Sequence, residues 1–80
     1  MTNEILDSII SEAIEKIILR KPELTDSTDL TKDLQMDSLD IVEFYTTIEE
    51  KFGIRVNDED ISTCGTTIKD VKELIKKYAK

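Results

Sequence analysis

The chain has 80 residues, of which 39% are hydrophobic and 36% are charged, and its net charge at pH 7 is −7. This length predicts a single domain over residues 1–80 with one modest core, too small to enclose a deep catalytic cleft as well. The negative charge argues against binding to nucleic acid or anionic lipid, and it favours basic protein surfaces as partners.

No apolar run approaches the roughly 20 residues needed to cross a bilayer, so we expect no membrane insertion. The opening residues MTNEILDSII lack the basic start of a secretion signal. A single cysteine, Cys64, cannot close a disulfide within the chain. These features predict a cytoplasmic protein, or one of an organelle interior if a targeting segment has already been removed.

The first expected element is an amphipathic helix over about residues 3–19, in which eight apolar residues recur at helical spacing. Pro22 disfavours any continuation of this helix. Residues 20–37 have no sustained period and are rich in Asp, Ser and Thr, which predicts a long connection. Three leucines should pin this connection to the core: Leu24, Leu30 and Leu34.

A second helix is expected from Asp37 or Ser38 to Phe52. Gly53 stands where a left-handed residue is needed to end it, and Ile54 can fold back onto the helix. A three/four spacing is followed by an apolar stripe of Leu39, Val42, Tyr45, Ile48 and Phe52, which Ile41 and Phe44 flank.

A short third helix is expected near residues 58–63, with Asn57 or Asp58 as its cap. The fourth helix should begin after Thr67, which has capping-box spacing to Asp70. Its predicted buried stripe is Ile68, Val71, Leu74, Ile75 and Tyr78. The chain is therefore predicted to be all-α, a small bundle of three longer helices and one short one.

Little catalytic chemistry is available to this chain. Histidine is absent, so a Ser-His-acid triad cannot form and the commonest metal ligand is missing. Asp37 and Asp40 are most simply solvated carboxylates, and Cys64 is most simply a packing residue. The stretch DSTDLTKD lacks the glycine and the terminal glutamate of a calcium loop. We expect no catalysis by the chain alone and no metal site.

Ser38, taken in isolation, is most simply a helix-capping residue. However, the stretch DLQMDSLDIVEF at residues 33–44 resembles the modification site of acyl carrier proteins, in which the serine of Asp-Ser-Leu opens the second helix. The chain length, the long pinned loop, EEKFGI and VNDED extend this resemblance to nearly the whole chain. The resemblance implies 4′-phosphopantetheine attached to Ser38. It also implies acyl groups carried as thioesters to enzymes of fatty-acid or related polyketide or lipid biosynthesis, with the acyl chain sliding between the helices.

The resemblance also implies a phosphopantetheinyl transferase and acyl-processing enzymes as partners, with basic docking surfaces that recognise the second helix. Residues 37–60 carry eight acidic and two basic residues, a net charge of −6. Leu39 should contact partners if it is exposed, although core packing is an equal alternative. A monomer is expected because the acidic faces repel one another. The implied partner-binding residues are Asp37, Leu39, Asp40, Glu43, Glu49, Glu50, Asp58, Glu59 and Asp60.

Two positions depart from the family pattern. Gln35 stands where glycine is common, three residues before the modified serine, and Thr46 replaces an apolar contact residue that is frequent in fatty-acid-synthesis carriers. These two departures leave open a second hypothesis, in which the chain is a specialised carrier for amino acids or for a secondary-metabolite pathway. A third hypothesis is an unmodified acidic helical adaptor in which Ser38 is only a cap.

Overall fold

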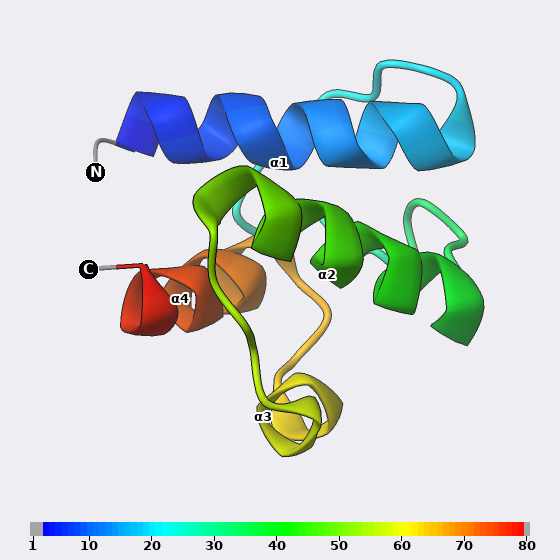
Figure 1. Cartoon of the computed structure of the whole chain (residues 1–80). Coiled ribbons are helices and arrows are strands. Elements are labelled where there is room, and N and C mark those ends of the chain that lie inside the picture. Colours follow the sequence, from blue (N-terminus) through cyan, green and yellow to red (C-terminus); the bar gives the residue numbers. More distant parts are fainter. Residues whose placement is uncertain (1–2, 80) are drawn as a thin grey trace.

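The computed structural model describes residues 3–79 of the chain. The element order is α1 (Asn3–Ile18), α2 (Ser38–Phe52), α3 (Asp58–Thr63) and α4 (Ile68–Tyr78). Figure 1 shows α1 along one edge of the molecule, α2 running back beneath it, and the short α3 at the opposite edge. Within residues 3–79 the fold is all-α, as predicted, with three longer helices and one short one.

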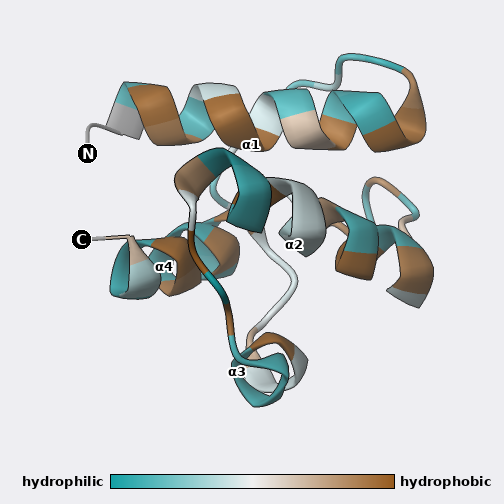
Figure 2. Ribbon diagram, viewed as in Figure 1, coloured by the Kyte–Doolittle hydropathy of each residue, from teal (hydrophilic) through white to brown (hydrophobic). Residues whose placement is uncertain are grey.

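Helix α1 buries one continuous face. Leu6, Ile10, Ala13 and Ile14 are at most 1% exposed, as their spacing on a 3.6-residue period requires. In Figure 2, hydrophobic and hydrophilic bands alternate along α1 and α2. The principal contact between helices is that of α1 with α2, so the buried face of α1 lies mainly against α2.

Two residues of the apolar stripe of α2 do not reach the core. Leu39 is 77% exposed and Val42 is 60% exposed. The buried face is formed instead by Phe44, Tyr45 and Ile48. A three/four spacing fits two neighbouring faces of this helix, and the sequence alone does not say which of them α1 covers.

The connection between α1 and α2 is pinned to the core, as predicted: Leu30 and Leu34 are buried and Leu24 is partly buried. It is also joined to the segment that precedes α4. The N–H of Leu30 donates to the carbonyl of Thr66 at 2.8 Å, and the N–H of Ile68 donates to the carbonyl of Thr28 at 2.9 Å. These bonds fix the loop that delivers the chain to the start of α2.

Lys72 of α4 adds an electrostatic tie to this arrangement. Its ammonium group lies 2.6 Å from the carboxylate of Asp7 in α1 and 3.0 Å from that of Asp26 in the loop. The ion pair with Asp7 raises the pKa of Lys72, and the pair with Asp26 adds to the effect. One side chain therefore connects α1, the α1–α2 loop and α4.

The predicted helix ends are confirmed. Gly53 is left-handed, with φ 66°, and the N–H of Ile54 donates to the carbonyl of Glu49 at 3.1 Å. Asn57 caps α3, and Thr67 caps α4 by accepting from the N–H of Asp70. Local sequence signals thus determine where these helices begin and end.

Gln35 adopts a left-handed backbone, with φ 57°, in a position that favours glycine. We expect Gln35→Gly to raise the free energy of unfolding by up to about 1 kcal/mol, since it removes the steric cost of a Cβ in this region. Urea denaturation measures the change. Gln35→Ala, which keeps the Cβ, should stay within about 0.5 kcal/mol of the wild type. A glycine variant less stable than the wild type would contradict this explanation.

Candidate functional site

Ser38 is the first residue of α2 and its side chain is exposed. The cap of this helix is Asp37, whose carboxylate accepts from the N–H of Asp40 at 2.9 Å. The carboxylate of Asp40 in turn accepts from the N–H of Asp37 at 3.2 Å. This reciprocal pair is a capping box built from two aspartates. The capping role that the sequence left open for Ser38 therefore belongs to Asp37.

The position of Ser38 suits a covalently attached phosphate ester. Because Asp37 already caps the helix, the Ser38 hydroxyl is not needed for that purpose and faces solvent. An anion bound there would lie at the positive end of the α2 dipole, beside N–H groups of the first turn that lack helical partners. The residues present thus fit a phosphodiester on Ser38.

An apolar surface lies beside Ser38. Leu39 and Val42 are among the most exposed large hydrophobic residues of the molecule. The alternative that Leu39 packs in the core is wrong, because its side chain is 77% exposed. Exposed apolar side chains next to a reactive position are a feature of interaction surfaces.

The predicted partner-binding acids divide into two groups. In the first group the carboxylates stabilise the fold: Asp37 and Asp40 form the capping box, and the carboxylate of Glu49 accepts from the N–H of Val56 at 2.8 Å. Asp60 also belongs to this group. The acids of the second group are all exposed: Glu43, Glu50, Asp58 and Glu59.

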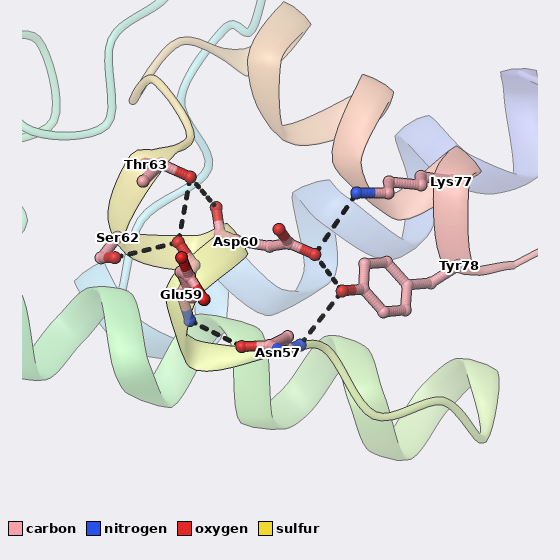
Figure 3. A network of polar contacts seen from close by, with 7 residues as sticks. All are labelled: Asn57, Glu59, Asp60, Ser62, Thr63, Lys77 and Tyr78. Atoms are coloured by element: carbon pink, nitrogen blue, oxygen red, sulfur yellow. Dashed lines mark hydrogen bonds and ion pairs between the residues drawn. The ribbon is translucent and has the colours of Figure 1, made fainter.

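Asp60 fastens α3 to α4 (Figure 3). Its carboxylate accepts a hydrogen bond from the Tyr78 hydroxyl and lies 3.4 Å from the ammonium of Lys77. The Tyr78 oxygen also accepts from the N–H of Asn57 at 3.3 Å. The hydrogen bond between Asp60 and Tyr78 lowers the pKa of Asp60 and raises that of Tyr78. We call these four residues the α3–α4 clasp.

The α3–α4 clasp predicts a defined pH dependence. The lowered pKa of Asp60 stabilises the fold above its unfolded value of about 4, and this contribution is lost as the pH falls through the folded value. The raised pKa of Tyr78 stabilises the fold below about pH 10, and this contribution is lost as the pH rises through the folded value. Tyr78→Phe removes the hydrogen bond that contributes to both shifts, while Lys77 still lowers the pKa of Asp60.

We therefore expect the free energy of unfolding of the wild type to exceed that of Tyr78→Phe between about pH 4 and pH 10, and the difference to shrink outside this window. Denaturant titrations of both proteins across the pH range measure it. The other carboxylates contribute equally to the pH dependence of both proteins, so their contributions cancel in the difference between the two free energies of unfolding. A difference that does not change with pH would contradict the clasp.

A groove lies between α2 and α3, with a volume of about 420 Å³. On α2 its residues share a face with Ser38, since they follow that serine at intervals of four, seven, eight and eleven positions. The face that begins at Ser38 therefore leads directly into the groove. The lining residues are Val42, Tyr45, Thr46, Glu49, Asp58, Ile61 and Ser62.

Cys64 is partly buried and has a packing role, as predicted. Its sulfur accepts from the Tyr45 hydroxyl at 3.9 Å and donates to the carbonyl of Asp70 at 3.5 Å. Burial raises the pKa of the Cys64 thiol, so the thiol stays protonated near neutral pH and is a weak nucleophile.

Residues 3–79 contain no group of three or more His, Cys, Asp or Glu side chains that could hold a metal ion. None of the helices within these residues has the length and apolar character that a membrane span requires.

A small helical bundle that presents an exposed serine at the start of its second helix has the architecture of a carrier domain. The family profile described as a phosphopantetheine attachment site matches residues 6–75. The acyl carrier protein of Buchnera aphidicola subsp. Baizongia pistaciae (strain Bp) is 38% identical over 74 residues, which cover 86% of this chain and 94% of that protein. The chain belongs to the acyl carrier protein family.

Membership of this family confirms three predictions. Acyl carrier proteins are non-catalytic, so the chain is a carrier and not an enzyme. Their prosthetic group is phosphopantetheine, which this domain receives. Their role involves a phosphopantetheinyl transferase and acyl-processing enzymes.

Proposed function

We propose that Ser38 is the attachment residue and that the loaded protein presents acyl groups to enzymes of fatty-acid or related polyketide or lipid biosynthesis. The observation that supports this most strongly is the division of roles at the start of α2. Asp37 supplies the cap of α2, so the exposed hydroxyl of Ser38 is not needed to cap the helix. The bound group supplies a terminal thiol, on which acyl groups are held as thioesters.

In the loading reaction, the Ser38 oxygen attacks the phosphorus atom of coenzyme A that bears the pantetheine. A new P–O bond to Ser38 forms, the P–O bond of the pyrophosphate linkage breaks, and adenosine 3′,5′-bisphosphate leaves. The serine proton passes to a general base, which we propose the transferase supplies. The first turn of α2 then stabilises the phosphodiester through its free N–H groups.

The proposed docking surface combines the apolar and acidic residues around Ser38. Leu39 provides exposed apolar contact area, and the exposed carboxylates provide attraction to basic partner surfaces. Because four of the predicted acids also stabilise the fold, we propose the exposed ones as the principal partner contacts: Glu43, Glu50, Asp58 and Glu59. The contributions of Asp37, Asp40, Glu49 and Asp60 are proposed to be smaller.

Incubation with coenzyme A, magnesium and a broad-range transferase tests the attachment. Intact-mass measurement should show a gain of one phosphopantetheine group per chain. Absence of any gain, with a known carrier protein loaded in parallel, would refute the proposal.

A specialised cargo is the second candidate, and the groove favours it. Thr46, which stands where fatty-acid-synthesis carriers often have an apolar contact residue, lines this groove. Mass spectrometry of the protein isolated from its own cells would identify the cargo.

We also propose that the protein is a monomer and that it is cytoplasmic. The repulsion between acidic faces supports the first, and the free thiol of Cys64 supports the second.

A further inference from the structure

Arg55 is a cation within an acidic surface. It belongs to the connection between α2 and α3 (Figure 1), and its side chain is exposed. The carboxylates of Glu50 and Asp58, which precede and follow it in the sequence, are also exposed. Within residues 3–79, the Arg55 guanidinium makes no hydrogen bond or ion pair with these carboxylates or with any other group. All of its N–H donors are therefore available to a partner.

The backbone on both sides of Arg55 is fixed by one residue of α2. The carbonyl of Glu49 accepts from the N–H of Ile54 at 3.1 Å, and the carboxylate of Glu49 accepts from the N–H of Val56 at 2.8 Å. The Val56 side chain belongs to the core. Because its neighbours are held in this way, Arg55 is presented from a defined place at the end of α2. A contact that is preorganised in this manner loses less conformational entropy on binding.

Two hollows meet at Arg55. One has a volume of about 590 Å³ and lies between the end of α2, the connection to α3 and the α3–α4 clasp. The other has a volume of about 380 Å³ and lies along the last turns of α2. Arg55 lines both, with Asp58 in the first and Glu50 in the second. Side chains of a partner can therefore approach the guanidinium from either side.

A carboxylate is the group that Arg55 fits best. The planar guanidinium presents its N–H groups as a fork that matches the two oxygens of a carboxylate. A uniformly basic partner surface would be attracted by Glu50 and Asp58 but repelled by Arg55. A basic surface with one carboxylate opposite Arg55 would complement all three charges. Arg55 thus adds a requirement that the net charge of the surface does not express.

A partner that engages Ser38 can also reach Arg55. Helix α2 rises about 21 Å from Ser38 to its last residue, at about 1.5 Å per residue. A standard interface of about 800 Å² per partner spans a comparable distance. The transferase is the partner that every copy of the chain must engage in order to be loaded.

We propose that Arg55 is a specificity-determining residue of the docking surface. It pairs with a carboxylate of the cognate phosphopantetheinyl transferase, which is the transferase of the cell that makes this protein. Basic groups of that enzyme on either side of the carboxylate face Glu50 and Asp58. The pairing of Arg55 rests on the proposed function and deepens it, since it names a contact of opposite charge to the acidic ones.

The test measures kcat/KM for loading by the cognate transferase at low ionic strength. Arg55→Gln removes the pair and should lower kcat/KM about fivefold, whereas Arg55→Glu replaces the pair by repulsion and should lower it about twentyfold. High salt should reduce both losses. Arg55→Lys keeps the charge but not the fork, and it should lose less than Arg55→Gln.

Lys51→Glu is the matched control. Lys51 is the other cation of residues 37–60, and it is exposed in the last turn of α2 but lines neither hollow. Its variant has the same change in net charge as Arg55→Glu, and its kcat/KM should stay within about twofold of the wild type or rise. Urea denaturation should give unchanged midpoints for the Arg55 variants, because the side chain has no partner within the described residues.

The sign of the effect decides between the alternatives. A merely solvated Arg55 would leave kcat/KM unchanged in Arg55→Gln, and an Arg55 that faces basic groups would give a faster Arg55→Glu. Either result would overturn the inference, and so would equal losses in Arg55→Glu and Lys51→Glu. Intact mass after prolonged treatment shows whether each variant is loaded. A wild type that is never loaded would refute the attachment itself, so the two failures are distinguishable.

Discussion

Replacement of Ser38 by alanine is expected to abolish phosphopantetheine loading completely while changing the free energy of unfolding by less than about 0.5 kcal/mol. Loading is lost because no other oxygen replaces the hydroxyl at the start of α2. Stability is retained because the cap belongs to Asp37, and alanine suits the first turn of a helix. Intact mass after transferase treatment and urea denaturation of the same variant measure the two effects.

The variant Asp37→Ala is the complementary test, because it removes the helix cap and keeps the proposed attachment residue. It should lower the free energy of unfolding by about 1 kcal/mol through loss of the cap, yet it should still accept the group. If Ser38→Ala is loaded as well as the wild type, the attachment residue has been misassigned. If Ser38→Ala is destabilised as much as Asp37→Ala, the division of roles at this helix start is incorrect.

Reversing charge at Glu43 and Glu50 is expected to lower the transferase kcat/KM for this protein at least tenfold, which corresponds to about 1.4 kcal/mol. Both side chains are exposed on α2, so the double variant Glu43→Lys/Glu50→Lys should fold normally. It replaces attraction to a basic partner surface by repulsion, and the loss should shrink at high salt. Initial rates of loading at low and high ionic strength measure the effect.

Glu12→Lys/Glu15→Lys provides a matched control on α1, where both acids are also exposed. This variant has the same change in net charge as the α2 variant but leaves the α2 surface intact. Its kcat/KM should stay within about twofold of the wild type, because a distant exposed charge is largely screened. Equal losses in the two variants would show that net charge, and not a docking surface on α2, governs the encounter.

Much of the fold could be predicted because its helix boundaries are encoded locally. Gly53 ends α2 and Thr67 begins α4 through contacts within a few residues along the chain. The buried stripe of α1 could be predicted because Leu6, Ile10, Ala13 and Ile14 recur at helical spacing on one face. Signals of this kind depend on neighbours in sequence, so they do not require knowledge of the tertiary packing.

The face of α2 could not be assigned in the same way. Leu39 and Val42 fit the helical spacing as well as Phe44 does, and the choice between the two faces is made by α1. The exposure of Leu39 is therefore a tertiary property. A signal was nonetheless available in the acids beside it, since a helix face that carries both apolar and acidic residues next to a modification site suits partner contact.

Long-range polar contacts were also beyond sequence reasoning. The ion pairs of Lys72 and the hydrogen bond between Asp60 and Tyr78 join residues that are distant along the chain. Nothing local distinguishes Asp60 from Asp58, yet Asp60 holds α3 to α4 while Asp58 is exposed. The division of the acids into fold-stabilising and exposed groups therefore required the structure.

The most direct test of the central proposal is localisation of phosphopantetheine in the loaded wild-type protein by tandem mass spectrometry. Trypsin cleavage after Lys32 and Lys51 gives a peptide of residues 33–51, in which Ser38 is the only serine. We predict that fragment ions assign the group to Ser38. An unmodified 33–51 peptide from a loaded protein, or fragments that place the group on another residue, would contradict the assignment.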